Sequence, residues 1–316
     1  MALIDRALAN GIRVKAWTFD ELYGRDGVFL DALEERRQVF VAEVPANFHG
    51  WARQPQVLHD GPSPRRGKKK KYPRVARRYP SSEVQNLVTY SPEFRQQNWQ
   101  RYRIKDTHRG PEVWEVKWAV FWRKDSAGLP GRRHCLIVTR NVLTGEVKYF
   151  ISNRVPGDRN PVTGQTVTLR WLLRVAFGRW SVESCFREAK EELGLDHYEV
   201  RGWRCVPRHL YLTQLSHLFC ARIRQKFNDG ATRDDPLEHL TTEQVRRAMN
   251  TWLSTQDQHL TMKQRLEREL EKQQYHQRRN RQARKSHTKT RIAKLKALGI
   301  DPNRIKTCIP NAPNDP

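Results

Sequence analysis

The first 45 residues contain the feature that most constrains the fold, a strand–helix–strand pattern. Apolar residues alternate between Ile12 and Asp20, which is typical of a strand. Asp26 is placed to cap a helix, and Val39–Val44 is a second apolar segment of strand length. Two strands and a helix within so short a stretch predict parallel strands joined by a crossover helix. The sequence therefore predicts an α/β fold.

A basic segment and a block of strands come next. No regular pattern runs from Pro45 to about Arg109, and Arg65–Arg78 within it is almost entirely basic. This segment is either a solvated loop or an arm that binds phosphates, and the two roles are compatible. We then expect three strands, with a hairpin turn at residues 143–146, as an antiparallel block inserted between two α/β halves. The three strands are Val113–Arg123, His134–Thr139 and Glu146–Ser152.

The rest of the chain is predicted to be helical. One helix covers Thr168–Leu193, with an irregularity at Gly178, and a second covers Pro207–Phe227. Beyond residue 243 the sequence is helical in pattern and highly charged. Within this region Gln273–Lys296 is very basic and poor in apolar residues, so we expect it to be ordered only in part.

The net charge of +25, with a pI near 10.3, indicates a polyanionic partner. Nucleic acid is the first candidate, because neutralised phosphates release counterions. An acidic membrane surface is the alternative, although no apolar run approaches the roughly 20 residues of a transmembrane helix. The first residues do not have the pattern of a secretory signal. Five irregularly spaced cysteines do not suggest a disulfide framework, so we expect a cytoplasmic, nucleoid-associated protein.

Four charged residues form one polar stripe on the first of these helices. Arg179, Glu183, Arg187 and Lys190 are separated by offsets of four, eight and eleven. One interpretation is a solvated face held by weak ion pairs between neighbouring turns. The other is a carboxylate that binds a metal ion, with cations beside it that hold a phosphate. Phosphodiester chemistry with two metal ions needs carboxylates of this kind.

Asp20 is the natural second carboxylate. It lies at the carboxyl end of the first predicted strand, which is where open α/β sheets bind their ligands. The alternative is an aspartate that only caps a turn. Considered alone, the residue fits both interpretations.

Two stretches of the sequence resemble bacterial insertion-sequence transposases of the acidic-triad (DDE) type. Thr18–Asp26, with its Tyr-Gly pair, resembles the segment around the second aspartate of that family. Arg179–Lys190, continued as far as Tyr198, resembles the Tyr-x2-Arg-x3-Glu-x6-Lys signature. The tyrosine position of the signature falls on Ala176, so that phosphate contact is absent. The resemblance spans roughly residues 10 to 225.

The resemblance implies an RNase H-like catalytic domain with a β-rich insertion. Asp20 and Glu183 would be catalytic ligands for Mg²⁺ or Mn²⁺, and Arg179 and Lys190 would contact double-stranded DNA near the scissile phosphate. The implied reaction is hydrolytic nicking of transposon ends followed by transfer of a 3′-hydroxyl to target DNA, carried out by a homodimer. Further expected DNA contacts are Arg187, Lys68, Lys69, Lys70 and Lys71.

The expected architecture is a partial RNase H-like domain with an inserted antiparallel β-rich subdomain and a helical, basic C-terminal tail. Residues 1–45 and 166–227 make the catalytic domain, 46–165 the basic loop and insertion, and 228–316 the partly disordered tail. The first aspartate of the triad should lie well upstream of Asp20. Asp5 is the sole aspartate before it and lies in a helical pattern. We therefore expect a chain truncated at its N-terminus and inactive in isolation.

Two other functions remain open at this point. One is a non-catalytic DNA-binding remnant that inhibits transposition, which the missing first aspartate favours. The other is a basic protein that associates with RNA or the ribosome, which explains the charge but not the acidic pair.

Two further groups of residues have simpler explanations than binding. A zinc site at Cys205, His209, His217 and Cys220 lacks the usual Cys-x2-Cys spacing. The ten tryptophans are mostly core candidates. One in the β block could stack on an extruded base, and the sequence does not choose between Trp118 and Trp122.

Overall fold

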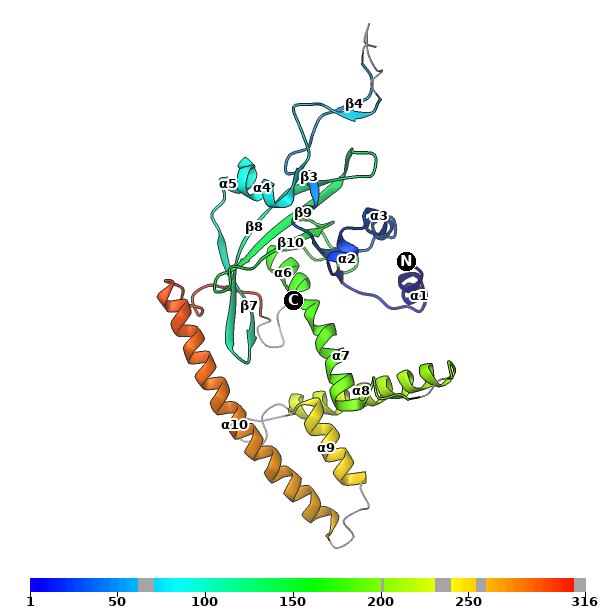
Figure 1. The fold of residues 1–316 in the computed structure, drawn as a ribbon, viewed down its shortest axis with the longest axis vertical. Coiled ribbons are helices and arrows are strands. Elements are labelled where there is room, and N and C mark those ends of the chain that lie inside the picture. Colours follow the sequence, from blue (N-terminus) through cyan, green and yellow to red (C-terminus); the bar gives the residue numbers. More distant parts are fainter. Residues whose placement is uncertain (62–70, 200–201, 231–239, 254–259, 310–316) are drawn as a thin grey trace. The chain divides into compact units, whose positions relative to one another are not determined.

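The chain forms two compact units. The computed structural model describes residues 1–61, 71–199, 202–230, 240–253 and 260–309 (Figure 1). Unit 1 consists of Met1–Arg179 and Thr290–Pro316, and unit 2 consists of Trp180–Lys289.

Unit 1 begins with the predicted strand–helix–strand arrangement. Strands β1 and β2 pair in parallel, with Trp17 opposite Phe40, which confirms the predicted crossover. The first strand is much shorter than expected, because Ile12 is half exposed and the residues around it have no buried face to occupy. The elements are α1 (Ala2–Ala9), β1 (Trp17–Phe19), α2 (Glu21–Gly24), α3 (Gly27–Glu35) and β2 (Phe40–Val44).

The three later strands belong to the same sheet as β1 and β2. Strand β10 pairs antiparallel with β2, with Ile151 opposite Ala42, and β9 and β8 follow in order. The antiparallel block is therefore confirmed, but it continues the α/β sheet instead of forming the inserted subdomain that we expected. The pairing of β10 with β2 decides this, and no local sequence pattern reports it. The strands are β7 (Gln100–Thr107), β8 (Gly110–Lys124), β9 (Pro130–Asn141) and β10 (Val147–Ser152).

Both faces of this mixed sheet are buried. Side chains alternate between two core clusters, so that Leu136 and Val138 face one cluster while Ile137 faces the other. Helices α1 and α3 contribute to the first cluster, as do α4 (Val84–Tyr90) and α5 (Pro92–Arg95). Helix α6 (Leu169–Gly178) covers the second. The alternation in β8 follows the same rule, with Trp114 and Val116 in the second cluster.

The region from Pro45 to Arg109 contains several elements that the sequence pattern did not show. Val84 in α4 and Phe94 in α5 are fully buried, so these short helices depend on tertiary packing more than on their own periodicity. Two short strands extend the main sheet beyond β8, and two others pair only with each other. The first two are β3 (His49–Trp51) and β6 (Ser82–Glu83), and the others are β4 (Val57–Leu58) and β5 (Arg74–Val75).

The C-terminal residues return to unit 1. Helix α10 (Met262–Ala297) is continuous, and Leu295 near its end is fully buried against Val113 and Ile300. Strand β11 (Lys306–Thr307) then pairs in parallel with β7. Gln273 to Lys296, for which we expected partial order, lies within this helix. The segment is rich in good helix formers, and Leu295 is the one apolar side chain of α10 that is buried among the described residues.

Unit 2 is helical. It contains α7 (Trp180–Leu193), α8 (Cys205–Gly230), α9 (Thr242–Leu253) and the first part of α10. The predicted helix 168–193 is thus two helices, with the break immediately after Gly178.

Helix α10 contacts α9 within unit 2. The Gln273 side chain donates to the backbone carbonyl of Gln244 and is almost fully buried. Among the described helices of both units, none is long and apolar enough to cross a membrane.

Candidate active site

Asp20 lies directly after β1, at the carboxyl end of that strand. Its side chain accepts a hydrogen bond from the backbone N–H of Tyr23 at 3.4 Å and caps α2. The residue therefore performs the structural role that we considered as the alternative to metal binding. Capping by one oxygen does not exclude the other role, since a carboxylate has two oxygens with several acceptor positions.

Gly24 explains why a Tyr-Gly pair follows this aspartate. A Cβ at Gly24 would lie 1.8 Å from the backbone carbonyl oxygen of Glu43 in β2. Only glycine allows α2 to approach the sheet so closely. Tyr23 packs in a small aromatic group with Phe19 and Phe29, with ring centroids 4.9 to 6.0 Å apart. This segment fixes the backbone that carries Asp20.

Glu43 is a carboxylate near this site that the sequence analysis did not single out. Phe19 pairs with Ala42 in the parallel register, so Asp20 and Glu43 follow equivalent positions of the two strands. The carboxylate of Glu43 is 2.9 Å from the amine of Lys148, and this ion pair is partly buried. Glu43 is identified by its position near the end of β2, beside the strand that precedes Asp20. Only the pairing of β1 with β2 shows this position.

Glu183, Arg187 and Lys190 lie on α7 in unit 2, and all three are exposed. The guanidinium of Arg187 lies 5.9 Å from the centre of the Trp180 ring. Arg179 has helical backbone angles but lies outside α7, as the last residue of the first segment of unit 1. Asp20 belongs to unit 1 and Glu183 to unit 2, so their association in one site stays a prediction.

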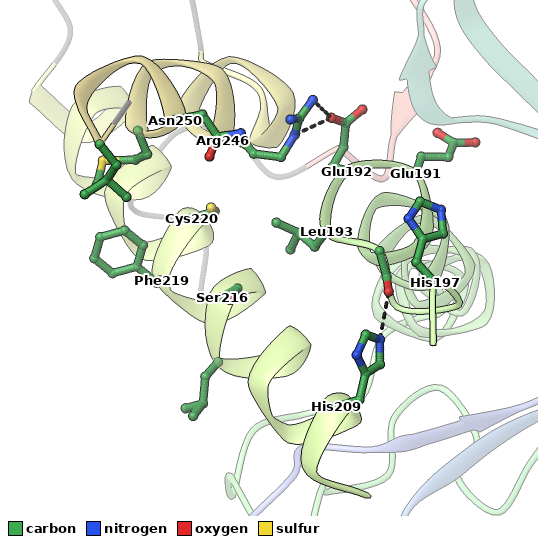
Figure 2. Close-up of a pocket in the computed structure, with 14 residues that line it drawn as sticks. Glu191, Glu192, Leu193, His197, His209, Ser216, Phe219, Cys220, Arg246 and Asn250 are labelled. Carbon is green, nitrogen blue, oxygen red and sulfur yellow. Dashed lines mark hydrogen bonds and ion pairs between the residues drawn. The ribbon is translucent and has the colours of Figure 1, made fainter. Parts of the chain in front are cut away.

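The residues after α7 close that helix against α8. Gly194 has φ of 69°, which suits a helix end, and its carbonyl oxygen accepts a 2.8 Å hydrogen bond from Nε2 of His209 (Figure 2). Leu195 is buried, and its N–H bonds to the carbonyl of Ala189. The Tyr198 ring packs on His209 at 5.6 Å. Residues 194–198, which belong to the transposase-like stretch, therefore pack the end of α7 against α8 within unit 2.

Ala176 occupies the tyrosine position of the signature and is buried in the second core cluster of unit 1. It packs with Leu172 and Leu173 on the inner side of α6. A residue in this position contacts the sheet, so the missing phosphate contact is consistent with its surroundings.

A cavity of about 960 Å³ lies beside residues 194–197, between α7, α8 and α9. Its wall combines apolar side chains with an ion pair between Glu192 and Arg246 at 3.1 Å, which Figure 2 shows at its rim. The cavity is lined in part by Leu193, Leu215, Phe219, Met249 and Leu253. Glu191, His197 and Ser216 also line it.

The described residues do not by themselves form a metal site. Throughout the described ranges, no group of three or more His, Cys, Asp or Glu side chains is arranged to hold a metal ion. The four residues considered for zinc have other environments. His209 bonds to Gly194, and Nδ1 of His217 lies 3.7 Å from Sγ of Cys185. Cys220 is buried while Cys205 is exposed.

The structure tests little of the remaining predicted DNA contacts. Lys68, Lys69 and Lys70 lie outside the described residues, and Lys71 beside them is exposed. Trp118 and Trp122 are both half-buried in β8, so burial does not choose between them as a stacking platform.

Comparison with known proteins supports part of the resemblance. Residues 1–111 match the model of a family described as DDE superfamily endonuclease. This match supports a DDE-type transposase or endonuclease family, and the mixed α/β fold is consistent with a DDE nuclease. The matched segment includes Asp20 and ends before α7, so Glu183 is outside it. No curated protein matches the chain.

Proposed function

We propose that this chain belongs to a bacterial insertion-sequence transposase, which cleaves DNA strands and joins them to a target. The observation that carries the proposal is the position of Asp20. It lies within the segment that matches DDE endonucleases and directly follows a strand of a mixed α/β sheet. Transposon ends and target duplex are the proposed substrates, and a homodimer on DNA is the proposed assembly.

In this proposal the chain contributes two acidic residues to the active site, Asp20 and Glu183. Asp5 is a poor third candidate, because it lies in α1 and forms a 2.5 Å ion pair with Arg36, whose hydrogen bond lowers the pKa of that carboxyl. We propose that residues outside this chain provide the third carboxylate. DDE nucleases generally use divalent metal ions, and Mg²⁺ or Mn²⁺ is the expected cofactor of the completed site.

The proposed contributions of the other residues concern substrate binding. Arg179 and Lys190 would hold the DNA backbone near the reacting phosphate, and Arg187 and the lysines at positions 68 to 71 would extend this contact. Arginine presents a planar fork that suits phosphate oxygens, whereas lysine acts as a point charge.

The test is strand cleavage of labelled duplexes made from the DNA on either side of the gene, with Mg²⁺ or Mn²⁺. The chain is assayed both alone and joined to the translated sequence upstream of Met1. Asp20→Asn keeps a capping side chain but removes the charge, and Glu183→Gln removes the charge on α7 with little change of shape. Glu191→Gln, an exposed position on the same helix, is the matched control.

We expect the extended protein to cleave, the Asp20 and Glu183 variants to lose cleavage, and the Glu191 variant to retain it. Cleavage that survives Glu183→Gln would remove this residue from the mechanism. An extended protein that binds the duplex but never cleaves it would contradict the proposal.

A second candidate function is a non-catalytic DNA-binding protein that inhibits transposition. The observation that favours it is that Asp5, the only aspartate before Asp20, lies in α1 and is paired with Arg36. This function predicts steeply salt-dependent DNA binding that is unchanged in an Asp20→Asn/Glu183→Gln double variant. It also predicts that the chain lowers cleavage by an active full-length enzyme when the two are mixed.

A further inference from the structure

The later part of α10 carries a concentration of positive charge that no site described above uses. From Lys272 to Lys289 the helix has seven basic residues and no acidic residue. Its beginning is different, because Glu267, Glu269 and Glu271 alternate with cations there and Lys263 lies 4.0 Å from Glu267. The net charge is therefore localised within one continuous helix, which is drawn in orange in Figure 1.

Four of these cations share one side of the helix. With about 100° of rotation per residue, Arg278, Arg281, Lys285 and Lys289 fall within an arc of about 80°. All four side chains belong to exposed residues. The row spans eleven residue steps, from position 278 to position 289, which corresponds to about 16 Å at roughly 1.5 Å per residue. We name this row of four residues the cationic stripe.

In the sequence the stripe lies between two residues of α10 that are packed, each within its own unit. Within unit 2, Gln273 is nearly buried and donates to the backbone of Gln244 in α9, five residues before the stripe begins. Within unit 1, Leu295 anchors the other end of the same helix in a core cluster. The four cations therefore lie together on one continuous helix.

Such a row has a specific electrostatic requirement. Like charges three and four residues apart destabilise a helix, and a polyanion that runs alongside relieves the repulsion. Double-stranded DNA has one phosphate per roughly 3.4 Å along each strand, so a row of about 16 Å can follow several phosphates. A membrane is not favoured, because the exposed residues around the stripe are mainly polar and present no apolar face for insertion.

We propose that the cationic stripe is a binding site for the phosphate backbone of double-stranded DNA, separate from the candidate active site. The inference rests on the proposed function, which makes DNA the polyanion. It assigns to α10 the task of holding the duplex without reading its sequence, because backbone contacts carry no sequence information directly.

The test measures binding and avoids cleavage. Fluorescence anisotropy with a labelled random-sequence duplex is recorded in EDTA over a range of KCl concentrations. Arg278→Gln/Lys285→Gln/Lys289→Gln removes three charges from the stripe. Lys263→Gln/Arg268→Gln/Lys272→Gln removes three exposed charges from the same helix outside the stripe. Glutamine keeps the helix propensity close to that of the residues it replaces.

We expect the stripe variant to reduce the slope of log K against log [KCl] by roughly 2 to 3, at about 0.9 per phosphate contact, and the control variant to change it by less than roughly 1. Equal slopes for the two variants would overturn the proposal, as would a clear preference for single-stranded DNA or RNA. Because binding is measured in EDTA, where no cleavage occurs, a wrong assignment of the stripe can be distinguished from a wrong assignment of the active site.

Discussion

His134 and Glu34 meet inside unit 1, where Nε2 of the imidazole lies 2.7 Å from Oε1 of the carboxylate. The imidazole is fully buried and the Glu34 side chain is only 5% exposed. Nδ1 of His134 donates to the carbonyl oxygen of Arg132 at 2.8 Å. The contact joins β9 to α3, the helix that follows the Asp20 segment. It therefore holds α3 against the sheet.

Replacing His134 with leucine should destabilise unit 1 by about 3 kcal/mol, because the buried carboxylate of Glu34 loses its main partner. The double variant His134→Leu/Glu34→Leu should recover part of this loss, since no buried charge remains. Urea unfolding followed by tryptophan fluorescence measures both. Strictly additive losses in the double variant would show that the two side chains do not interact.

Replacing Gly24 with alanine should lower the free energy of unfolding by roughly 1 to 3 kcal/mol or more, because the new Cβ collides with the backbone of Glu43. Gly178→Ala is the matched control, since it lies at the end of α6 and a Cβ added there would have no atom within 4 Å. That control should cause no loss of stability. If both variants unfold at the same urea concentration as the wild type, α2 does not pack on β2 in this way.

The five cysteines should differ in their reactivity toward a disulfide reagent such as DTNB. Burial raises the pKa of the Cys135, Cys220 and Cys308 thiols, whereas Cys185 and Cys205 are exposed. At pH 8 we expect two thiols to react rapidly in the native protein and five in denaturant. Cys185→Ser and Cys205→Ser should each remove one rapid equivalent. Rapid reaction of three or more native thiols would contradict the described packing.

Cys308 should make the stability of unit 1 depend on pH in the alkaline range. Burial raises the pKa of its thiol from the ordinary value of 9.0 to about 11. The contribution of the buried Cys308 thiol to the free energy of unfolding is complete below pH 9. It is lost between pH 9 and 11, because the thiol ionises there in the unfolded chain but remains protonated in the folded one. The stability difference between wild type and Cys308→Ala should therefore shift by up to about 3 kcal/mol over this range. A difference that is constant with pH would show that the thiol is not buried.

Local patterns in the sequence were sufficient for several elements. The crossover from β1 to β2, the cap at Asp26 and the hairpin after Asn141 were predicted and are present. Each depends on residues close together in the chain, namely alternating apolar side chains, a carboxylate before a helix, or a glycine in a turn. The sequence also predicted where Asp20 lies relative to its strand. Its role, and that of Glu183, stay predictions.

Contacts between distant segments decided the rest. The pairing of β10 with β2, the nearness of Glu43 to the Asp20 strand and the burial of Leu295 involve residues far apart in the sequence. Hydrogen bonds between strands and the burial of an apolar side chain depend on which surfaces meet, and periodicity does not encode that. The sequence by itself determined the basic character of the chain and its α/β class. Only the tertiary structure decided that the antiparallel block continues the α/β sheet, because that sheet is assembled from contacts that no local segment contains.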